Sequence, residues 1–258
     1  MATTVLITGA TSGIGAEFAR QFAARGCDLV LVARSVESLE RTAAELRDAD
    51  GVEVEVLPAD LLDDDGRHRV LERIRAGGEP GSGAASVDVL VNNAGYGLSA
   101  PFADNSLDDE IDHLRIHVEV PLALAHAALQ VMRRNRVGTV INVASVAGFV
   151  PRGSYGAAKA AMISFSRWAN VIYAGDGIRV TALCPGFVHT DFHQRMGADK
   201  GGVPRLLWLD AGFVVRRALR DTAAGRAVSI PGLRYRALVA AARLLPSSLV
   251  TRAASMGR

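Results

Sequence analysis

The sequence is poor in cysteine, in aromatic residues and in lysine. Its two cysteines, Cys27 and Cys184, lie far apart and form neither a CxxC pair nor a metal-ligand spacing, so we expect no metal site. Aromatic residues make up 5% of the 258 residues, and the core must therefore be built from Val, Leu, Ile and Ala. This composition suits buried parallel strands that are covered by Ala-rich helices.

Long hydrophobic runs and a strong net charge are also missing. No apolar stretch reaches the roughly 18 residues that a membrane span needs, and no signal segment precedes the first strand-like run, which begins at Thr4. We therefore expect a cytoplasmic protein. The net charge of +2 is too small to indicate nucleic-acid binding, although residues 205–258 hold ten Arg against two Asp. A small-molecule substrate is the expected partner.

Strand-like and helix-like patterns alternate along the chain. We expect strands at Val5–Thr8, Asp28–Ala33, Val52–Leu57, Val87–Val91, Val137–Val143 and Arg179–Leu183, and helices at Ile14–Arg25, 35–50, 63–76, Leu107–Arg134 and Tyr155–Tyr173. This alternation predicts an α/β fold, a doubly wound, Rossmann-like parallel sheet flanked by helices, with residues 1–258 as a single domain. Such sheets bind ligands beyond the carboxyl ends of their strands.

A glycine-rich run joins the first strand to the first helix. Gly9 permits a tight turn, Gly13 lets the backbone approach a pyrophosphate, and Gly15 lets the helix pack closely on the strand. The helix then offers free N–H groups and the positive end of its dipole to the phosphates. We predict phosphate binding by this loop, with further contacts from Thr11, Ser12 and Ile14.

Tyr155 and Lys159 stand four residues apart on a predicted helix and therefore share one of its faces. A free tyrosine has a pKa near 10 and is a poor base at neutral pH, but a nearby ammonium lowers that pKa. An incidental YxxxK pair is the competing interpretation. The composition argues against it: the chain has two lysines and 27 arginines, so an indifferent surface cation would be an arginine.

The TGxxxGxG spacing from Thr8 and the YxxxK pair resemble the short-chain dehydrogenase/reductase family, over about residues 3–190. The resemblance implies hydride transfer between a nicotinamide cofactor and a carbonyl or secondary-alcohol carbon. Ser145 would then orient the substrate oxygen, Tyr155 would give or take the proton, and Lys159 would hold the ribose. Ser145 precedes Tyr155 by ten residues, a few fewer than is usual in the family.

The end of the second strand favours NADP(H) over NAD(H) as the cofactor. A carboxylate at this position commonly holds the ribose hydroxyls of NAD, but the sequence here is Ala-Arg-Ser, with Arg34 in the middle. An arginine cannot accept those hydroxyl hydrogens, whereas it can bind a 2′-phosphate through charge-assisted hydrogen bonds. The competing interpretation is a solvated arginine in an arginine-rich chain.

The resemblance assigns further cofactor contacts after the third, fourth and sixth strands. Helix caps and ordinary turns are the competing interpretations of these segments. The assigned residues are Asp60 and Leu61 beside the adenine, Asn93, Ala94 and Gly95 of an NNAG motif, and Pro185, Gly186, Val188 and Thr190 of a PGxxxT segment at the nicotinamide.

His117 marks a departure from the family pattern. Many members carry an Asn at this position, where it helps to hold a proton-relay water. His117 can replace the Asn, because its ring also bonds water and a backbone carbonyl. Two other interpretations stay open: a satisfied core histidine, or a chain without the relay and with slow turnover.

Two segments leave the substrate and the partners open. Residues 191–210, together with Phe102 and Phe149, could line an apolar pocket for a lipophilic substrate, or could be plain core; the first group includes Phe192, Met196, Leu206, Leu207 and Trp208. The amphipathic, basic tail 231–258 could cover the pocket, pack on a partner subunit or lie on an anionic membrane, the last being the least favoured.

The resemblance implies a homodimer or homotetramer formed by the helices 107–134 and 155–173. A regulator that binds NADP(H) without turnover and a membrane-surface scaffold are the alternatives to an enzyme.

Overall fold

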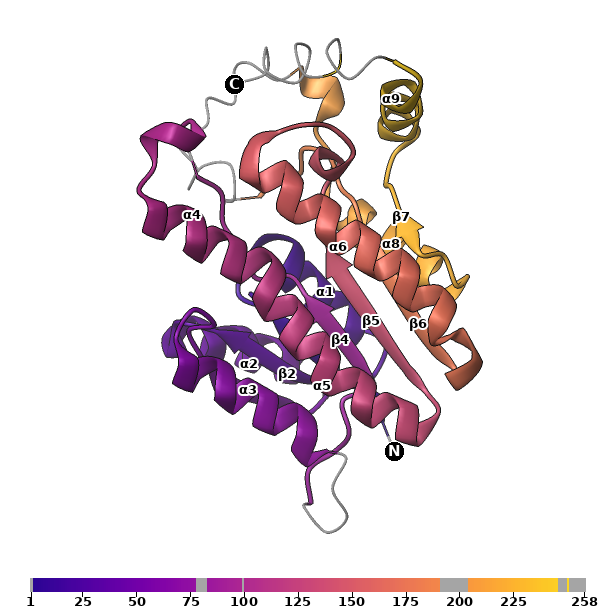
Figure 1. Ribbon diagram of the computed structural model, residues 1–258. Coiled ribbons are helices and arrows are strands. Elements are labelled where there is room, and N and C mark those ends of the chain that lie inside the picture. Colours follow the sequence, from indigo (N-terminus) through magenta and orange to yellow (C-terminus); the bar gives the residue numbers. More distant parts are fainter. Residues whose placement is uncertain (1, 78–82, 99, 191–203, 246–249, 251–258) are drawn as a thin grey trace.

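One parallel sheet organises the structure. The computed structural model describes residues 2–77, 83–98, 100–190, 204–245 and 250. Its seven strands stand in the order β3-β2-β1-β4-β5-β6-β7, and each neighbouring pair is parallel (Figure 1). The strands are β1 (Thr4–Thr8), β2 (Asp28–Ala33), β3 (Val54–Pro58), β4 (Val89–Asn92), β5 (Gly138–Val143), β6 (Ile178–Leu183) and β7 (Val228–Ser229).

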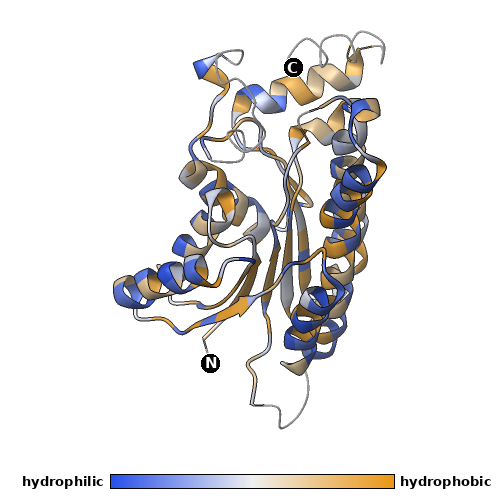
Figure 2. Ribbon diagram, turned by 90° about the vertical axis from the view of Figure 1, so that its left-hand side faces the viewer, coloured by the Kyte–Doolittle hydropathy of each residue, from blue (hydrophilic) through white to orange (hydrophobic). Residues whose placement is uncertain are grey.

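Helices cover both faces of this sheet (Figure 2). The helices are α1 (Gly13–Ala23), α2 (Val36–Asp50), α3 (Asp64–Ala76), α4 (Leu107–Leu114), α5 (Val120–Asn135), α6 (Gly153–Ile172), α8 (Ala211–Ala223) and α9 (Leu233–Leu244). Alternate side chains of a strand point to opposite faces, so Val5 and Ile7 join a core under α1, α2 and α8, whereas Leu6 joins a core under α3, α5 and α6. The predicted doubly wound fold is confirmed.

The long helix expected at 107–134 is present, but it is not uniform. Between α4 and α5 the chain widens into a π-helical turn at Arg115–Glu119, where the Val120 N–H donates to the Arg115 carbonyl five residues earlier. Pro121 explains the break, because it has no N–H to give to the carbonyl of His117, its helical partner four residues back. Single π turns inside α-helices often lie at functional sites.

Several local predictions need correction. The helix expected at 35–50 is α2, and Ser35 caps it, its side chain accepting from the Ser38 N–H. The helix expected at Tyr155–Tyr173 begins earlier, at Gly153, with Arg152 in its cap position, so Ser154 lies inside the first turn. The sequence patterns also gave no sign of β7 and α8.

The basic C-terminal region is organised around one buried carboxylate. Asp221 on α8 accepts from Ser229 at 2.8 Å and pairs with Arg217 at 3.0 Å and Arg226 at 3.2 Å. Arg236 of α9 approaches the same carboxylate at 3.9 Å. Three arginines of this region, Arg217, Arg226 and Arg236, therefore hold α8, β7 and α9 together.

Within the described residues, none of the helices has the length and apolar character required to cross a membrane.

Candidate active site

The glycine loop leaves the start of α1 open to an anion. Gly9 and Gly13 adopt positive φ angles of 66° and 55°, which favour glycine. Ser12 occupies the cap position of α1, yet its side chain makes no capping hydrogen bond. The helices α2, α3, α4 and α8 are each capped by a side chain, from Ser35, Asp63, Ser106 and Asp210. The first N–H groups of α1 thus fit a phosphate group.

Gly15 is the tightest point of the loop. A Cβ atom at this position would lie 2.2 Å from the Gly9 carbonyl oxygen and 2.5 Å from Nδ2 of Asn93. Gly15→Ala is therefore expected to lower the free energy of unfolding by about 1–3 kcal/mol, the usual cost of overpacking, and to weaken dinucleotide binding. Urea denaturation checks the first effect. Gly175→Ala is the control, since nothing lies within 4 Å of its Cβ position; equal stability of the two variants would contradict the prediction.

The NNAG segment braces the glycine loop from the neighbouring strand. Asn93 Nδ2 donates to the carbonyls of Thr8 at 2.9 Å and Gly9 at 3.1 Å. The Thr8 hydroxyl accepts from the N–H groups of Asn93 and Ala94. Gly95 leaves space for His117, because a Cβ at this position would lie 2.3 Å from the ring of His117. The motif therefore fixes both the loop and the histidine.

Ser145, Tyr155 and Lys159 meet at the carboxyl end of β5. Ser145 Oγ accepts from the Ala147 N–H at 3.1 Å, which leaves its own O–H free to donate. Lys159 Nζ donates to the Val143 carbonyl at 2.9 Å and lies 5.6 Å from the centre of the Tyr155 ring. The short gap between Ser145 and Tyr155 is bridged by a 3₁₀ turn at Val146–Phe149.

The electrostatics of the pair differ from the prediction. Burial raises the pKa of the Tyr155 phenol, while the adjacent Ser145 hydroxyl and the Arg152 guanidinium lower it. Burial also lowers the pKa of Lys159 to about 8. The ammonium is bonded to the Val143 carbonyl, and burial outweighs the effects that lower the pKa of the phenol.

His117 lies on the π turn and faces this site. Its Nε2 lies 2.6 Å from the Tyr96 carbonyl, which can only accept, so Nε2 carries the proton and Nδ1 has a free lone pair. The side chain is 3% exposed, and burial, reinforced by Lys159, holds its pKa well below the usual value. The imidazole is therefore neutral. Its ring centre is 5.6 Å from that of Tyr155.

A cavity of about 10 Å³ lies between His117 and Lys159. Asn92 and Val143 also line it. Two buried acceptors in this lining, Asn92 Oδ1 and His117 Nδ1, have no hydrogen-bond partner among the described residues. Leaving such an atom unpaired costs about 1–3 kcal/mol. The cavity has room for one water molecule, whose two O–H groups match the two acceptors.

A buried histidine and a buried carboxylate, which the sequence patterns did not single out, lie about one turn before His117. His113 is 1% and Glu110 is 4% exposed. Both ring nitrogens of His113 and Oε2 of Glu110 lack hydrogen-bond partners among the described residues. The ring of His113 is 4.6 Å from that of His117 and 5.8 Å from that of Tyr155, centre to centre.

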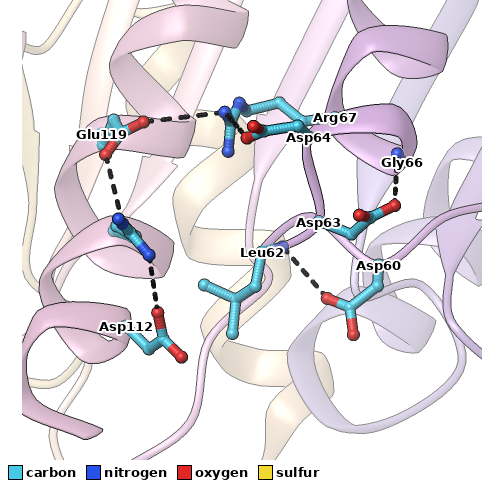
Figure 3. A network of polar contacts seen from close by, with 9 residues as sticks. Asp60, Leu62, Asp63, Asp64, Gly66, Arg67, Asp112 and Glu119 are labelled. Atoms are coloured by element: carbon cyan, nitrogen blue, oxygen red, sulfur yellow. Dashed lines mark hydrogen bonds and ion pairs between the residues drawn. The ribbon is translucent and has the colours of Figure 1, made fainter. Parts of the chain in front are cut away.

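Arg34 and Asp60 lie at the edge of the sheet, beyond β2 and β3. Arg34 is exposed and makes no ion pair within the described part of the chain, so its guanidinium is free for a ligand. Asp60 accepts from the Leu62 N–H, and Leu61 is buried. Asp63 rather than Asp60 caps α3, as Figure 3 shows. One Asp60 oxygen is thus left over for another contact.

An ion-pair network ties α3 to the π turn beside this edge (Figure 3). Arg67 pairs with Asp64 at 2.5 Å and with Glu119 at 3.9 Å. Glu119 also pairs with Arg115, and Arg115 with Asp112. The network helps to fix the helix that carries His117.

The PGxxxT segment closes over the other end of the site. Thr190 lies against the glycine loop, since a Cβ on Gly13 would be 3.2 Å from it. The Tyr235 hydroxyl of α9 accepts from the Phe187 N–H at 3.0 Å and donates to the Leu207 carbonyl at 2.5 Å, and its ring fills the space over Gly186. The first part of the tail thus covers this segment. Val188 is buried, and Pro185 accepts from the Val146 N–H.

The structure describes only some of the residues that were expected to line an apolar pocket. Phe192 and Met196 lie outside the described residues, as does most of the segment 191–210 and the end of the tail. Phe102 and Leu206 are largely exposed. Trp208 stacks on His189, with the two ring centres 4.9 Å apart.

Comparisons with known proteins agree with this geometry. The family described as short chain dehydrogenase matches residues 3–201. A relative described as very-long-chain 3-oxoacyl-CoA reductase, from Anas platyrhynchos, is 35% identical over 192 residues; the match covers 72% of this chain and 59% of that relative's length.

Two solved structures are similar over most of the chain. One is a short-chain dehydrogenase from Sphingobium yanoikuyae in complex with NADPH, with 35% identity, a TM-score of 0.83 and coverage of 93% of this chain and 94% of the other. The second is the bulky-bulky ketone specific alcohol dehydrogenase from Comamonas testosteroni, with 31% identity, a TM-score of 0.79 and coverage of 93% and 92%.

Proposed function

The chain belongs to the short-chain dehydrogenase family, and we propose that it is an NADP(H)-dependent oxidoreductase acting on a carbonyl or a secondary alcohol. The observation that carries the proposal is the meeting of Ser145, Tyr155 and Lys159 at the end of β5. This set faces the same sheet edge as the uncapped glycine loop. Dinucleotide binding alone does not require a phenol, a hydroxyl and an ammonium in one place.

Each residue of the site has a separate role in the proposed reaction. A bound nicotinamide dinucleotide supplies or accepts the hydride. The Ser145 O–H donates to the substrate oxygen and holds it near the phenol. Tyr155 gives its proton to that oxygen in reduction and takes it back in oxidation. Lys159 holds the cofactor ribose, and the N–H groups at the start of α1 hold the phosphates.

The raised pKa of Tyr155 suits the reductive direction. A phenol whose pKa is raised by burial stays protonated at neutral pH. It is therefore ready to donate when a carbonyl substrate arrives. Oxidation of an alcohol needs the phenolate instead, and we expect its rate to increase with pH.

Arg34 is the proposed determinant of NADP(H) preference. Arg34→Asp is expected to raise the KM for NADPH by about 10- to 100-fold, because a hydrogen bond to a charged group contributes about 1.5–3 kcal/mol. The KM for NADH is expected to fall, since a carboxylate can accept from the ribose hydroxyls. Initial rates with both cofactors measure the change. Arg41→Asp is the control, because Arg41 lies on α2, the helix that follows Arg34, and is paired with Glu37; an equal effect there would contradict the role of Arg34.

We propose a lipophilic substrate, on the support of the apolar residues in the segment 191–210 and of the ketone named for the Comamonas enzyme. A panel of carbonyl compounds with NADPH, and of alcohols with NADP⁺, followed at 340 nm, tests the function. The expected result is turnover that favours apolar carbonyls. Tight NADPH binding without turnover across the panel would favour a cofactor-sensing regulator.

We also propose a homodimer or homotetramer built on the long helices. Trp168, Val171 and Ile172 are exposed along one face of α6. Leu107, Ile111 and Leu114 are exposed on α4. Exposed apolar side chains grouped on a helix face support an interface between subunits.

A further inference from the structure

One side chain of α9 holds the PGxxxT segment from a distant part of the sequence. In Figure 1, α9 lies beyond the carboxyl ends of the strands, at the same end of the molecule as the site. Tyr235 in its first turn is 4% exposed. Its hydroxyl accepts from the Phe187 N–H at 3.0 Å and donates to the Leu207 carbonyl at 2.5 Å. The hydroxyl thus bridges two segments that lie 48 and 28 residues earlier in the chain.

This bridge requires the phenol of Tyr235 to be protonated. Burial raises the pKa of Tyr235, against the smaller opposing effect of the Phe187 N–H. A protonated phenol can accept one hydrogen bond and donate another, whereas a phenolate can only accept. Both partners of the hydroxyl are backbone groups, which fits a side chain that holds the backbone in place.

The two bridged segments are also paired with each other. The Leu209 N–H donates to the Phe187 carbonyl at 2.8 Å, and the His189 N–H donates to the Leu209 carbonyl at 3.0 Å. Val188 and Leu209 form a parallel β-bridge between these two hydrogen bonds. Tyr235 therefore adds a side-chain link to a short backbone ladder, so that the two segments are held as one unit.

The ring of Tyr235 packs on Gly186, next to the backbone that carries Ser145. A Cβ atom on Gly186 would lie 1.9 Å from Cζ of the Tyr235 ring, so glycine at this position leaves space for the ring. Pro185, the preceding residue, accepts from the N–H of Val146 at 3.0 Å, and Val146 directly follows Ser145. The contact of α9 with the PGxxxT segment thus extends to the backbone beside Ser145.

The other end of the PGxxxT segment meets the glycine loop. A Cβ atom on Gly13 would lie 3.2 Å from the side chain of Thr190. The segment 185–190 therefore runs from the backbone beside Ser145 to the loop that is proposed to hold the phosphates. A group that fixes this segment also fixes the edge of the site between the phosphate end and the reacting end.

The helix α9 has further anchors besides Tyr235. Arg234 donates to the Leu206 carbonyl at 2.8 Å, and Arg236 donates to the Ile230 carbonyl at 3.1 Å. These two arginines flank Tyr235 and should keep α9 docked when the tyrosine hydroxyl is removed. The effect of removing that hydroxyl should therefore be confined to the segments that it bridges.

We propose that Tyr235 is a positioning residue that holds the segment 185–190 where this segment contacts the nicotinamide end of the cofactor. The inference rests on the proposed function. Tyr235 acts through the backbone of Phe187 and through the packing of its ring on Gly186. Loss of the hydroxyl should weaken the contacts to the nicotinamide half of the cofactor, whereas the contacts of the glycine loop to the phosphates should stay as they are.

The test compares the affinity of two ligands for the wild type and for Tyr235→Phe by isothermal titration calorimetry. One ligand is NADPH, and the other is 2′-phospho-ADP-ribose, which has the same phosphates, riboses and adenine but no nicotinamide. Tyr235→Phe is expected to raise the Kd of NADPH by about tenfold, the usual effect of one lost hydrogen bond. The Kd of 2′-phospho-ADP-ribose should not change. Equal changes in the two dissociation constants, or no change in either, would overturn the inference.

Tyr173→Phe is the matched control, because it removes the same hydroxyl from a tyrosine at the end of α6. It should bind both ligands as the wild type does, and a tenfold loss of NADPH affinity there would count against a specific role of Tyr235. Thermal melting checks that both variants fold. A wild type that binds neither ligand would instead overturn the proposed function, so the two failures are distinct.

A second measurement needs no ligand. Amide hydrogen exchange, followed by mass spectrometry, should be faster over the segment 185–190 in Tyr235→Phe than in the wild type, because the Phe187 N–H loses its acceptor. Exchange in β1 should be the same in both proteins. Unchanged exchange over 185–190 would show that the hydroxyl does not hold this segment, and it would overturn the inference even if no substrate were found.

Discussion

Tyr155→Phe is expected to lower kcat by about a thousandfold, within the range for loss of a general acid–base group. The change removes one oxygen from a ring that packs against two neighbouring histidines, so the fold and the NADPH affinity should stay intact. Steady-state rates at 340 nm measure the loss, and fluorescence titration with NADPH measures binding.

Tyr173→Phe is the matched control for this experiment. Tyr173 follows the end of α6 and packs against Trp168 and Arg133, away from the site. Its variant should turn over at the wild-type rate. Loss of activity in both variants would indicate a general effect of the substitution on α6. Full activity in Tyr155→Phe would show that Tyr155 is not the general acid.

Lys159→Met is expected to abolish activity and yet to stabilise the fold at pH 7. Burial lowers the pKa of Lys159 from 10.5 to about 8, which corresponds to roughly 3 kcal/mol of unfavourable burial of the charged form. Methionine removes this cost but leaves the Val143 carbonyl without its donor, at about 1–2 kcal/mol. The expected net gain in the free energy of unfolding is about 1–2 kcal/mol. A residue that costs stability where it stands is consistent with selection for function.

The pH dependence gives this prediction a sign that can be checked. Between pH 8 and pH 10.5 the unfolded chain holds the lysine proton and the folded chain releases it, so the stability contributed by this group rises with pH. The advantage of Lys159→Met should therefore be constant below about pH 7 and should shrink towards pH 9.5. Urea denaturation at pH 7 and pH 9.5 measures it. An advantage that does not change with pH would mean that Lys159 is not charged and buried as described.

Much of the fold was predictable because it depends on local patterns. The alternation of apolar strands with helices, from Val5–Thr8 to Arg179–Leu183, predicted the parallel sheet, and the glycine loop fell between a strand and a helix as expected. The YxxxK spacing placed Tyr155 and Lys159 together because a helix brings residues four apart onto one face. Their roles in the reaction remain proposals.

The unpredicted features depend on tertiary contacts. The direction of the Lys159 ammonium is set by the Val143 carbonyl on another element, and the pKa of Tyr155 by how deeply the ring is buried. His113 and Glu110 lie among acidic residues at the polar start of a helix, a pattern typical of a solvated face, yet both are buried, and His113 packs against Tyr96 and Tyr155. Tyr235 showed no sequence sign of its contact with Gly186.

The proposed chemistry can be tested most directly by following a label. NADPH carrying deuterium at the transferable position of the nicotinamide is incubated with the best carbonyl of the panel, and the alcohol is analysed by mass spectrometry. We predict an alcohol that is one mass unit heavier, with the deuterium on the former carbonyl carbon, and its formation about a thousandfold slower by Tyr155→Phe. Unlabelled alcohol, or labelled alcohol formed equally well without the phenol, would contradict hydride transfer assisted by Tyr155.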